Sequence, residues 1–325
     1  KEAVTVFLRK TLAPTAAGFV LLAASLAVVP TAPAAAQEVV QDEGAAYRAW
    51  HDASQAGDNA KASAAAKAYL EQYPTGQYAD FLKKWLGTAQ MTALDAAIKE
   101  KRTADTITVG REILAADPEN LNVVYAVASQ VRGEMLGRPP VYDNAAAGVE
   151  FAQKGIAMVE AGKTLAGVAT FDKNGTLAWM TQMLALNAQK GGNAKEAIGL
   201  FDKSTAYAPG DPAIAGQNLL RVVALRNTAY AEAAKAFNAL PEADRAAAEP
   251  PPAVKAAKDA LNAEADGLID SAASFVAFGR SKNLAAAVVD RVNQTLEAAY
   301  KVRFPEDTTL DGLKKVLAEK CEPSQ

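Results

Sequence analysis

The chain has 325 residues, of which 50% are hydrophobic and 22% are charged, and its formal net charge is −3. Such a composition is typical of a folded protein with one large domain or two smaller ones. A nucleic-acid-binding protein needs a basic face, and the lysines and arginines form no such cluster. With one cysteine and one histidine in the sequence, a zinc site of the His/Cys type is excluded within a single chain.

The first 36 residues are predicted to be a signal peptide. A basic start, with Lys1, Arg9 and Lys10, precedes the apolar run Ala17–Val29, which is too short for a membrane-spanning helix. Small residues follow, and we expect cleavage between Ala36 and Gln37. This predicts a periplasmic or extracellular protein with no stable membrane span after cleavage. The alternative is an uncleaved membrane anchor.

A helical period of 3.6 residues runs through most of the remaining chain, and alternating β-branched runs are nearly absent, so we expect an all-α protein. The predicted helices span residues 42–56, 59–73, 76–101, 103–116, 119–136, 145–161, 176–190, 194–208, 212–227, 228–239, 252–279, 282–302 and 308–320. The stiff segment Glu249–Val254 contains three consecutive prolines and is a natural break. We therefore predict helical repeats in residues 37–240 and a C-terminal helical cap in residues 241–325.

The segment from Leu184 to Pro209 indicates that the helices form pairs. Two amphipathic helices flank a Gly-Gly-Asn turn at 191–193, and Ala185 and Ala197 fall where the helices would cross. Small side chains at a crossing allow two helices to approach closely. Because proline cannot continue a helix, Pro209 would direct the chain into the next pair.

This segment resembles the tetratricopeptide repeat (TPR), whose pattern combines small residues in the first helix with A-x3-F and a proline in the second. The corresponding positions are Thr181, Leu184, Ala185 and Ala188 in the first helix and Ala197, Phe201 and Pro209 in the second. The Trp and Tyr of the pattern are replaced by Thr181 and Ala188. The resemblance covers residues 42–240 and implies a right-handed α-solenoid of antiparallel helix pairs. An unrelated all-helical array is the alternative.

In TPR proteins the first helix of each pair lines a concave groove that binds partners. By register, the resemblance places ten residues there: Asn122, Tyr125, Ser129, Arg132, Trp179, Gln182, Leu186, Gln189, Asn218 and Arg221. Tyr, Trp and Arg are frequent in protein interfaces, and amides or Arg can hold a peptide backbone or a carboxylate. Ordinary packing is the alternative role for Tyr125 and Trp179.

The C-terminal part carries one apolar stripe at every fourth residue: Leu284, Val288, Val292, Leu296 and Tyr300. Such a stripe packs either inside a terminal cap, which we favour, or against a second copy of the chain. Cys321 is expected to be a solvated thiol, with an intermolecular disulfide as the alternative.

Three short motifs suggest chemistry but lack its requirements. Ala161–Thr164 reads AGKT without the earlier glycine of a phosphate loop, so we expect Gly162 to end a helix. His51, Asp52 and Ser54 lie too close in sequence on one helix to be oriented as a hydrolytic triad. Phe171–Thr176 lacks the distal ligand of a calcium loop and is predicted to be a turn before a helix at Thr176.

The sequence therefore predicts a non-enzymatic scaffold that binds a protein or peptide of the cell envelope, with no cofactor and no metal ion. Self-assembly end to end into an extracellular filament or tube is the alternative, because stacked repeat ends produce an open polymer. An enzyme or transport accessory would need a cluster of polar groups in a cleft.

Overall fold

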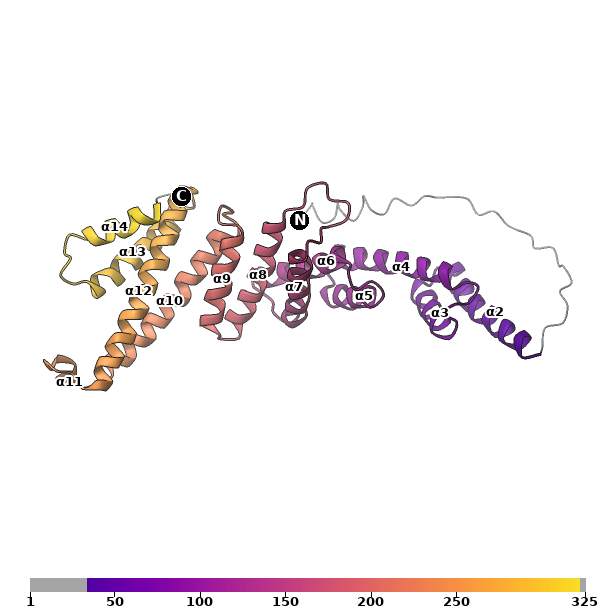
Figure 1. Ribbon diagram of the computed structural model, residues 1–325, viewed down its shortest axis with the longest axis horizontal. Helices are drawn as coiled ribbons and strands as arrows, with labels where there is room; N and C mark the ends of the chain where they lie inside the picture. The colour runs from indigo at the N-terminus through magenta and orange to yellow at the C-terminus, as the bar shows by residue number, and fades with distance from the viewer. Residues whose placement is uncertain (1–33, 322–325) are drawn as a thin grey trace. The chain divides into compact units, whose positions relative to one another are not determined.

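The computed structural model describes residues 34–321 (Figure 1), and it describes the side chains of residues 43–320. All thirteen elements of this part of the chain are helices, which confirms the all-α prediction. They are α2 (Ala34–Gln55), α3 (Asn59–Gln72), α4 (Ala79–Lys99), α5 (Thr103–Ala116), α6 (Leu121–Met135), α7 (Ala145–Glu160), α8 (Lys173–Lys190), α9 (Ala194–Tyr207), α10 (Ala215–Asn238), α11 (Glu242–Ala246), α12 (Pro252–Ser281), α13 (Ala286–Arg303) and α14 (Asp311–Cys321). The predicted apolar core of the signal peptide and the side chain of Cys321 lie outside the described residues.

Several helix boundaries differ from the prediction; among them, α2 begins at Ala34 rather than at residue 42, and α13 begins at Ala286 rather than at residue 282. The predicted helices 212–227 and 228–239 form the single helix α10, because no glycine or proline interrupts residues 217–238. Helix α8 begins at Lys173 rather than Thr176, since the Asp172 carboxylate accepts the backbone N–H of Gly175 at 2.8 Å and caps the helix. The short helix α11 was not among the predicted helices.

One tight turn recurs five times in the described residues, after α2, α4, α7, α8 and α12. In each, a backbone amide donates to the carbonyl oxygen five residues earlier at 2.8 to 3.0 Å, and the residue before that amide has a positive φ. The amides belong to Asp58, Arg102, Lys163, Asn193 and Leu284, and the positive-φ residues are Gly57, Lys101, Gly162, Gly192 and Asn283. This is the left-handed helix cap that reverses the chain within a few residues.

A second turn recurs where α3, α5, α9 and α13 end. The residues that follow these helices, Tyr73, Asp117, Ala208 and Phe304, all have φ between −129° and −139° and ψ between 63° and 80°, and each precedes a proline. Forty-four residues separate Tyr73 from Asp117, and the same number separates Asp117 from Ala161, where α7 ends in the left-handed turn instead. The regular interval is compatible with a helical repeat fold, although it is longer than the 34 residues of a TPR.

The described chain divides into two compact units. Unit 1 comprises residues up to Gly133 together with Leu165–Ala169, and unit 2 comprises Glu134–Thr164 and the residues from Thr170 onward. Within unit 1, α2 packs on α3, α3 on α4 and α4 on α5. Within unit 2, the helices from α7 to α10 pack in sequence, and α12 packs on α10, α13 and α14.

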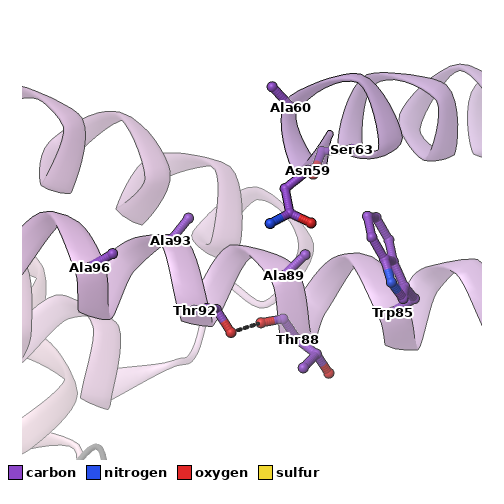
Figure 2. Close-up of a pocket in the computed structure, with 9 residues that line it drawn as sticks. All are labelled: Asn59, Ala60, Ser63, Trp85, Thr88, Ala89, Thr92, Ala93 and Ala96. Carbon is purple, nitrogen blue, oxygen red and sulfur yellow. Dashed lines mark hydrogen bonds between the residues drawn. The ribbon is translucent and has the colours of Figure 1, made fainter. Parts of the chain in front are cut away.

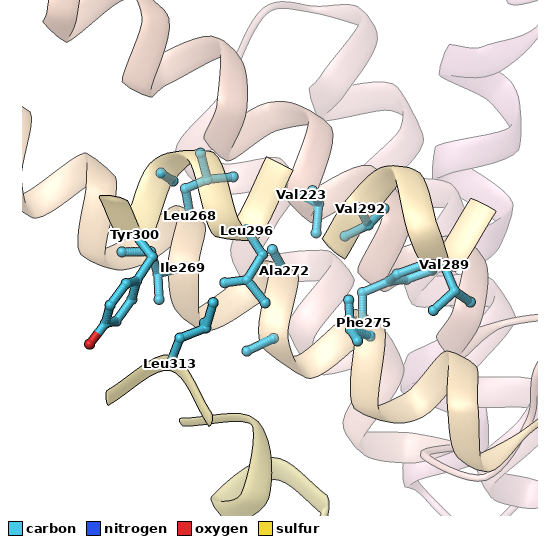
Figure 3. Close-up of a cluster of buried hydrophobic side chains, with 13 residues drawn as sticks. Val223, Leu268, Ile269, Ala272, Phe275, Val289, Val292, Leu296, Tyr300 and Leu313 are labelled. Atoms are coloured by element: carbon cyan, nitrogen blue, oxygen red, sulfur yellow. The ribbon is translucent and has the colours of Figure 1, made fainter. Parts of the chain in front are cut away.

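The C-terminal core of unit 2 lies between α12, α13 and α14 (Figure 3), and it contains the apolar stripe of α13. Val292, Leu296 and Tyr300 are buried there, and Leu284 and Val288 pack against them. The structure therefore corrects the alternative assignment of this stripe to a self-association surface, because α12 and its neighbours already cover it. Since Leu296 is 0% exposed, its truncation to Ala is expected to cost about 2–5 kcal/mol.

Candidate binding groove

Four of the ten predicted groove residues lie in the interior of unit 2, which corrects their placement on an open surface. Trp179 is 8% exposed, and Gln182, Leu186 and Asn218 are fully buried. The three residues of α8 are buried because this helix has α7 and α9 on two sides, and Asn218 is buried where α10 packs on α9 and α12. A partner could not reach these side chains without unfolding the unit.

The two buried amides belong to one polar network between α8, α9 and α10. Gln182 Nε2 donates to Asn218 Oδ1 at 2.7 Å, and Asn218 Nδ2 donates to the hydroxyl of Ser204 at 2.8 Å. The Ser204 hydroxyl in turn donates to the carbonyl oxygen of Ala178 at 2.7 Å. Buried polar groups that pair in this way fix the positions of helices rather than recognise a ligand.

The other predicted groove residues are half-buried. The Asn122 side chain accepts a hydrogen bond from the backbone N–H of Ala166 at 2.9 Å and donates one to the carbonyl oxygen of Ala166 at 3.3 Å. These two bonds hold the segment Leu165–Ala169 against α6. Arg221 donates to Gln189 at 3.1 Å. For these residues, and for Tyr125, Ser129 and Arg132, partner binding stays a prediction.

Unit 1 carries a surface that the sequence reasoning missed, a cluster of aromatic side chains from α2 and α4 around the buried Trp50. The rings of Phe81 and Trp85 stand edge-on to Trp50, with centroids 5.2 and 5.4 Å away. Tyr47 lies 5.3 Å from Trp50 and stacks on Tyr78 at 3.8 Å. Edge-to-face and stacked arrangements are the favourable geometries for aromatic rings. We call Tyr47, Trp50, Tyr78, Phe81 and Trp85 the aromatic cluster.

The aromatic cluster is partly open to solvent. Phe81 is 49% exposed, and Tyr47, Tyr78 and Trp85 are half-buried. The indole N–H of Trp50 is buried without a hydrogen-bond partner among the described residues. Burial, followed by the neighbouring Tyr78, raises the pKa of Tyr47 above its ordinary value. Exposed aromatic rings that are held in place by their neighbours are typical of a surface that binds a partner.

A groove of about 510 Å³ begins at Trp85 and runs between α3 and α4 (Figure 2). Its α3 side is formed by Asn59, Ala60 and Ser63, and its α4 side by Trp85, Thr88, Ala89, Thr92, Ala93 and Ala96. Beyond Trp85 the α4 side chains are threonines and alanines, so a ligand could approach this part of the helix closely. The hydroxyls of Thr88 and Thr92 each donate to a carbonyl one turn earlier in α4. We call this hollow the α3–α4 groove.

Ion pairs and caps fix the two helices that form the groove. Lys67, one turn beyond Ser63 on α3, pairs with Glu112 of α5 at 2.8 Å. The hydrogen bond from Lys67, with a smaller one from Gln90, lowers the pKa of the Glu112 carboxyl. At the other end of α3, the backbone N–H of Lys61 holds the pKa of the capping Asp58 below its ordinary range. Neutral amide and hydroxyl groups therefore line the groove, while its charges lie at the margins.

The remaining motifs have structural roles. Gly162 ends α7 with φ of 88°, as predicted, and so caps a helix rather than a phosphate. His51 Nδ1 lies 3.3 Å from Asp52 Oδ1 on the exposed face of α2. Both side chains are exposed to solvent.

The sequence did contain a signal for the aromatic cluster. Seven of the 22 aromatic residues fall between positions 47 and 85, including two of the three tryptophans. This density is far above that of the rest of the chain. The TPR pattern placed the predicted groove in residues 122–221 instead, where the match to the repeat is clearer.

Comparison of the chain with protein-family models, with curated proteins and with solved structures finds no match. Among the helices that the structure describes, none is long and apolar enough to cross a membrane.

Proposed function

We propose that this protein is a non-enzymatic TPR-type scaffold of the cell envelope, which holds an extended peptide segment of a partner protein in unit 1. The observation that carries this proposal is the junction of the aromatic cluster with the α3–α4 groove at Trp85. Aromatic rings supply affinity through apolar contact, and the neutral amide and hydroxyl groups can bond a peptide backbone without selecting a charged ligand.

The TPR assignment is part of the proposal and rests on the recurring turns. The left-handed turn after α2 and α4 alternates with the proline turn after α3 and α5, as in stacked antiparallel helix pairs, and α8 and α9 repeat this order, whereas α7 ends in a left-handed turn. In such an array α2 and α4 are first helices of pairs. These are the two helices that carry the aromatic cluster.

Secretion is the second part of the proposal. It is supported by the basic start, the apolar run Ala17–Val29 and the small residues before Gln37. Expression of the full chain in a bacterial host, followed by fractionation and mass measurement of the amino terminus, tests it. We expect a periplasmic form that begins at Gln37, whereas an intact amino terminus in the membrane fraction would overturn this part.

Binding is tested by closing the groove. Ala93 is an exposed alanine on the α4 side, so Ala93→Trp should fill the space without disturbing a core. Ala224 is an exposed alanine on α10 of unit 2, and Ala224→Trp is the matched control. Peptides are selected from a displayed random library against the wild-type chain, and their dissociation constants are measured for both variants.

We expect Ala93→Trp to weaken the selected peptides at least about tenfold and Ala224→Trp to leave them unchanged, since only the first variant occupies the groove. Equal affinities for both variants would show that peptides bind elsewhere. Assembly into a filament or tube remains the second candidate, and it requires a contact between copies.

A further inference from the structure

The connection between α10 and α12 contains the short helix α11 and, around it, single residues in the conformation that aromatic surfaces recognise. Pro241 and Ala247, on either side of α11, and Pro251, just before α12 begins at Pro252, have φ between −52° and −61° and ψ between 133° and 151°, which is close to the polyproline II helix. Glu249, Pro251 and Pro252 are exposed. Figure 1 shows this connection at one end of the paired helices α10 and α12, beside α11.

A polyproline II segment loses little conformational freedom on binding, because the proline rings already fix the backbone. Pro-rich segments therefore dock on clusters of exposed aromatic rings, with prolines seated between the rings. The aromatic cluster offers such a seat, because Phe81 and Trp85 are one helical turn apart on α4 and both stand edge-on to Trp50. The chain thus contains both a Pro-rich segment and a cluster of partly exposed aromatic rings.

An exposed acidic residue lies beside the Pro-rich segment, and the exposed Lys84 lies beside the aromatic cluster, one turn after the exposed Asp80. Glu249 immediately precedes the three prolines. Residues 239–251 contain two further acidic residues, while their one basic side chain, Arg245, donates to the carbonyl oxygen of Leu240. On α4, the exposed Lys84 lies three residues after Phe81 on the same side of the helix.

We propose that the aromatic cluster of one copy of this protein binds the segment Glu249–Pro252 of a second copy, with Lys84 opposite Glu249. This inference rests on the proposed function, since it names the partner of the same surface. The contact is heterologous, because it joins two different surfaces. Each copy keeps one free surface of each kind, so the contact favours open chains over closed dimers. Its small size predicts weak, reversible association.

The primary measurement is the mass of the full chain, purified after secretion, by sedimentation velocity over a wide concentration range. We expect the mean mass to rise with concentration. Pro250→Ala combined with Pro251→Ala should weaken the association at least about tenfold, and so should Phe81→Ala. These positions are exposed or half-buried, and unchanged thermal unfolding would show that the variants fold.

Charge reversal supplies the specific test. Lys84→Glu and Glu249→Lys should each weaken association, and the two together should restore it. The matched control is Lys315→Glu, because Lys315 lies ten residues after Pro305, as Lys84 does after Pro74, but beside no aromatic cluster. This control should leave the mass unchanged.

A synthetic peptide of residues 245–254 separates this inference from the proposed function. We expect it to change the fluorescence of Trp50 and Trp85 and to compete with self-association. A chain that stays monomeric at every concentration, or association that ignores the proline and charge variants, would overturn the inference. The proposed function would survive that result if library peptides still bound and Ala93→Trp still blocked them, and it would fail with the inference if they did not.

Discussion

The hydroxyl of Tyr69, near the end of α3, donates a hydrogen bond to the carboxylate of Glu43 on α2. The same hydroxyl accepts the backbone N–H of Tyr78 at 3.0 Å, and Glu43 accepts the N–H of Gln77 at 2.6 Å. Two side chains thus hold the turn that leads into α4. Because Tyr78 and Phe81 belong to the aromatic cluster, this network positions the candidate binding surface.

Replacing Tyr69 by Phe should lower the free energy of unfolding by about 1–3 kcal/mol, because the fully buried ring loses its hydroxyl and leaves the Tyr78 N–H without an acceptor. Chemical denaturation measures this. Tyr207→Phe is the control, since its hydroxyl makes only a long, exposed bond of 3.3 Å to Glu160. Similar losses in both variants would show that the network contributes no more than a surface contact.

The same residue predicts a loss of stability at alkaline pH. Burial, with the hydrogen bond to Glu43, raises the pKa of Tyr69 to about 12 from 10.0. The unfolded chain therefore releases this proton first, and the stabilisation that is complete below pH 10 is lost as the pH rises to 12. Unfolding free energies in this window should fall more steeply for the wild type than for Tyr69→Phe. Parallel curves would contradict the assignment.

Gly76 leaves space for the network. A Cβ atom at this position would lie 2.6 Å from the Tyr69 hydroxyl and 2.9 Å from Tyr73 Cβ, and it would also meet the Glu43 carboxylate. Gly76→Ala should therefore lower the melting temperature and disturb the cluster. Gly87→Ala is the matched control, because this α4 position is open and alanine favours a helix by about 0.5–1 kcal/mol. Equal melting temperatures for the two variants would show that the turn can rearrange to accommodate a Cβ atom at position 76.

The sequence predicted α3, α5 and α9 well, because the residues that begin and end these helices are close to them in sequence. The bounds of α5 agree with the prediction, and those of α3 and α9 agree within one residue, since each is delimited by a left-handed cap and a proline. The apolar stripe of α13 was also visible. The sequence of α13 does not show which helix packs on this stripe, and in the structure that helix is α12.

The groove prediction failed at α8 for a related reason. Gln182 and Asn218 are polar, so a helical pattern places them on the surface. In the structure they pair with each other across 36 residues of sequence, and such a long-range pair leaves no local signal. The aromatic cluster likewise depends on α2 meeting α4, which the sequence density of aromatic residues indicates but does not prove.

The buried amide pair gives a test of its structural role. Asn218→Leu should lower the free energy of unfolding by about 1–3 kcal/mol, because Gln182 Nε2 loses its acceptor in a site that water cannot reach. The double variant with Gln182→Leu should lose less than the sum of the two single variants, since both members of the hydrogen-bonded pair are then replaced. A double-mutant cycle from urea denaturation measures the coupling. Additive losses would show that the two amides act independently.

The turn between α13 and α14 predicts a loss of stability in acid. The Asp307 carboxylate accepts the backbone N–H of Gly312 at 2.8 Å and the hydroxyl of Tyr300 at 2.9 Å. The bond from Gly312, followed by those from Tyr300, Thr309 and Asp311, lowers the pKa of Asp307 from 3.8 to about 2. Because the folded pKa is depressed, the stabilisation is present above 3.8 and is lost as the pH falls through about 2.

Asp307→Asn should therefore melt at a lower temperature than the wild type at neutral pH, and the difference should shrink between pH 4 and pH 2, where the wild-type carboxylate becomes protonated. Thermal unfolding across this range measures it. Glu306→Gln removes the same charge from an exposed neighbour and should show little difference at any pH. If the difference for Asp307→Asn persisted unchanged at pH 2, the shape of the side chain rather than its charge would hold the turn.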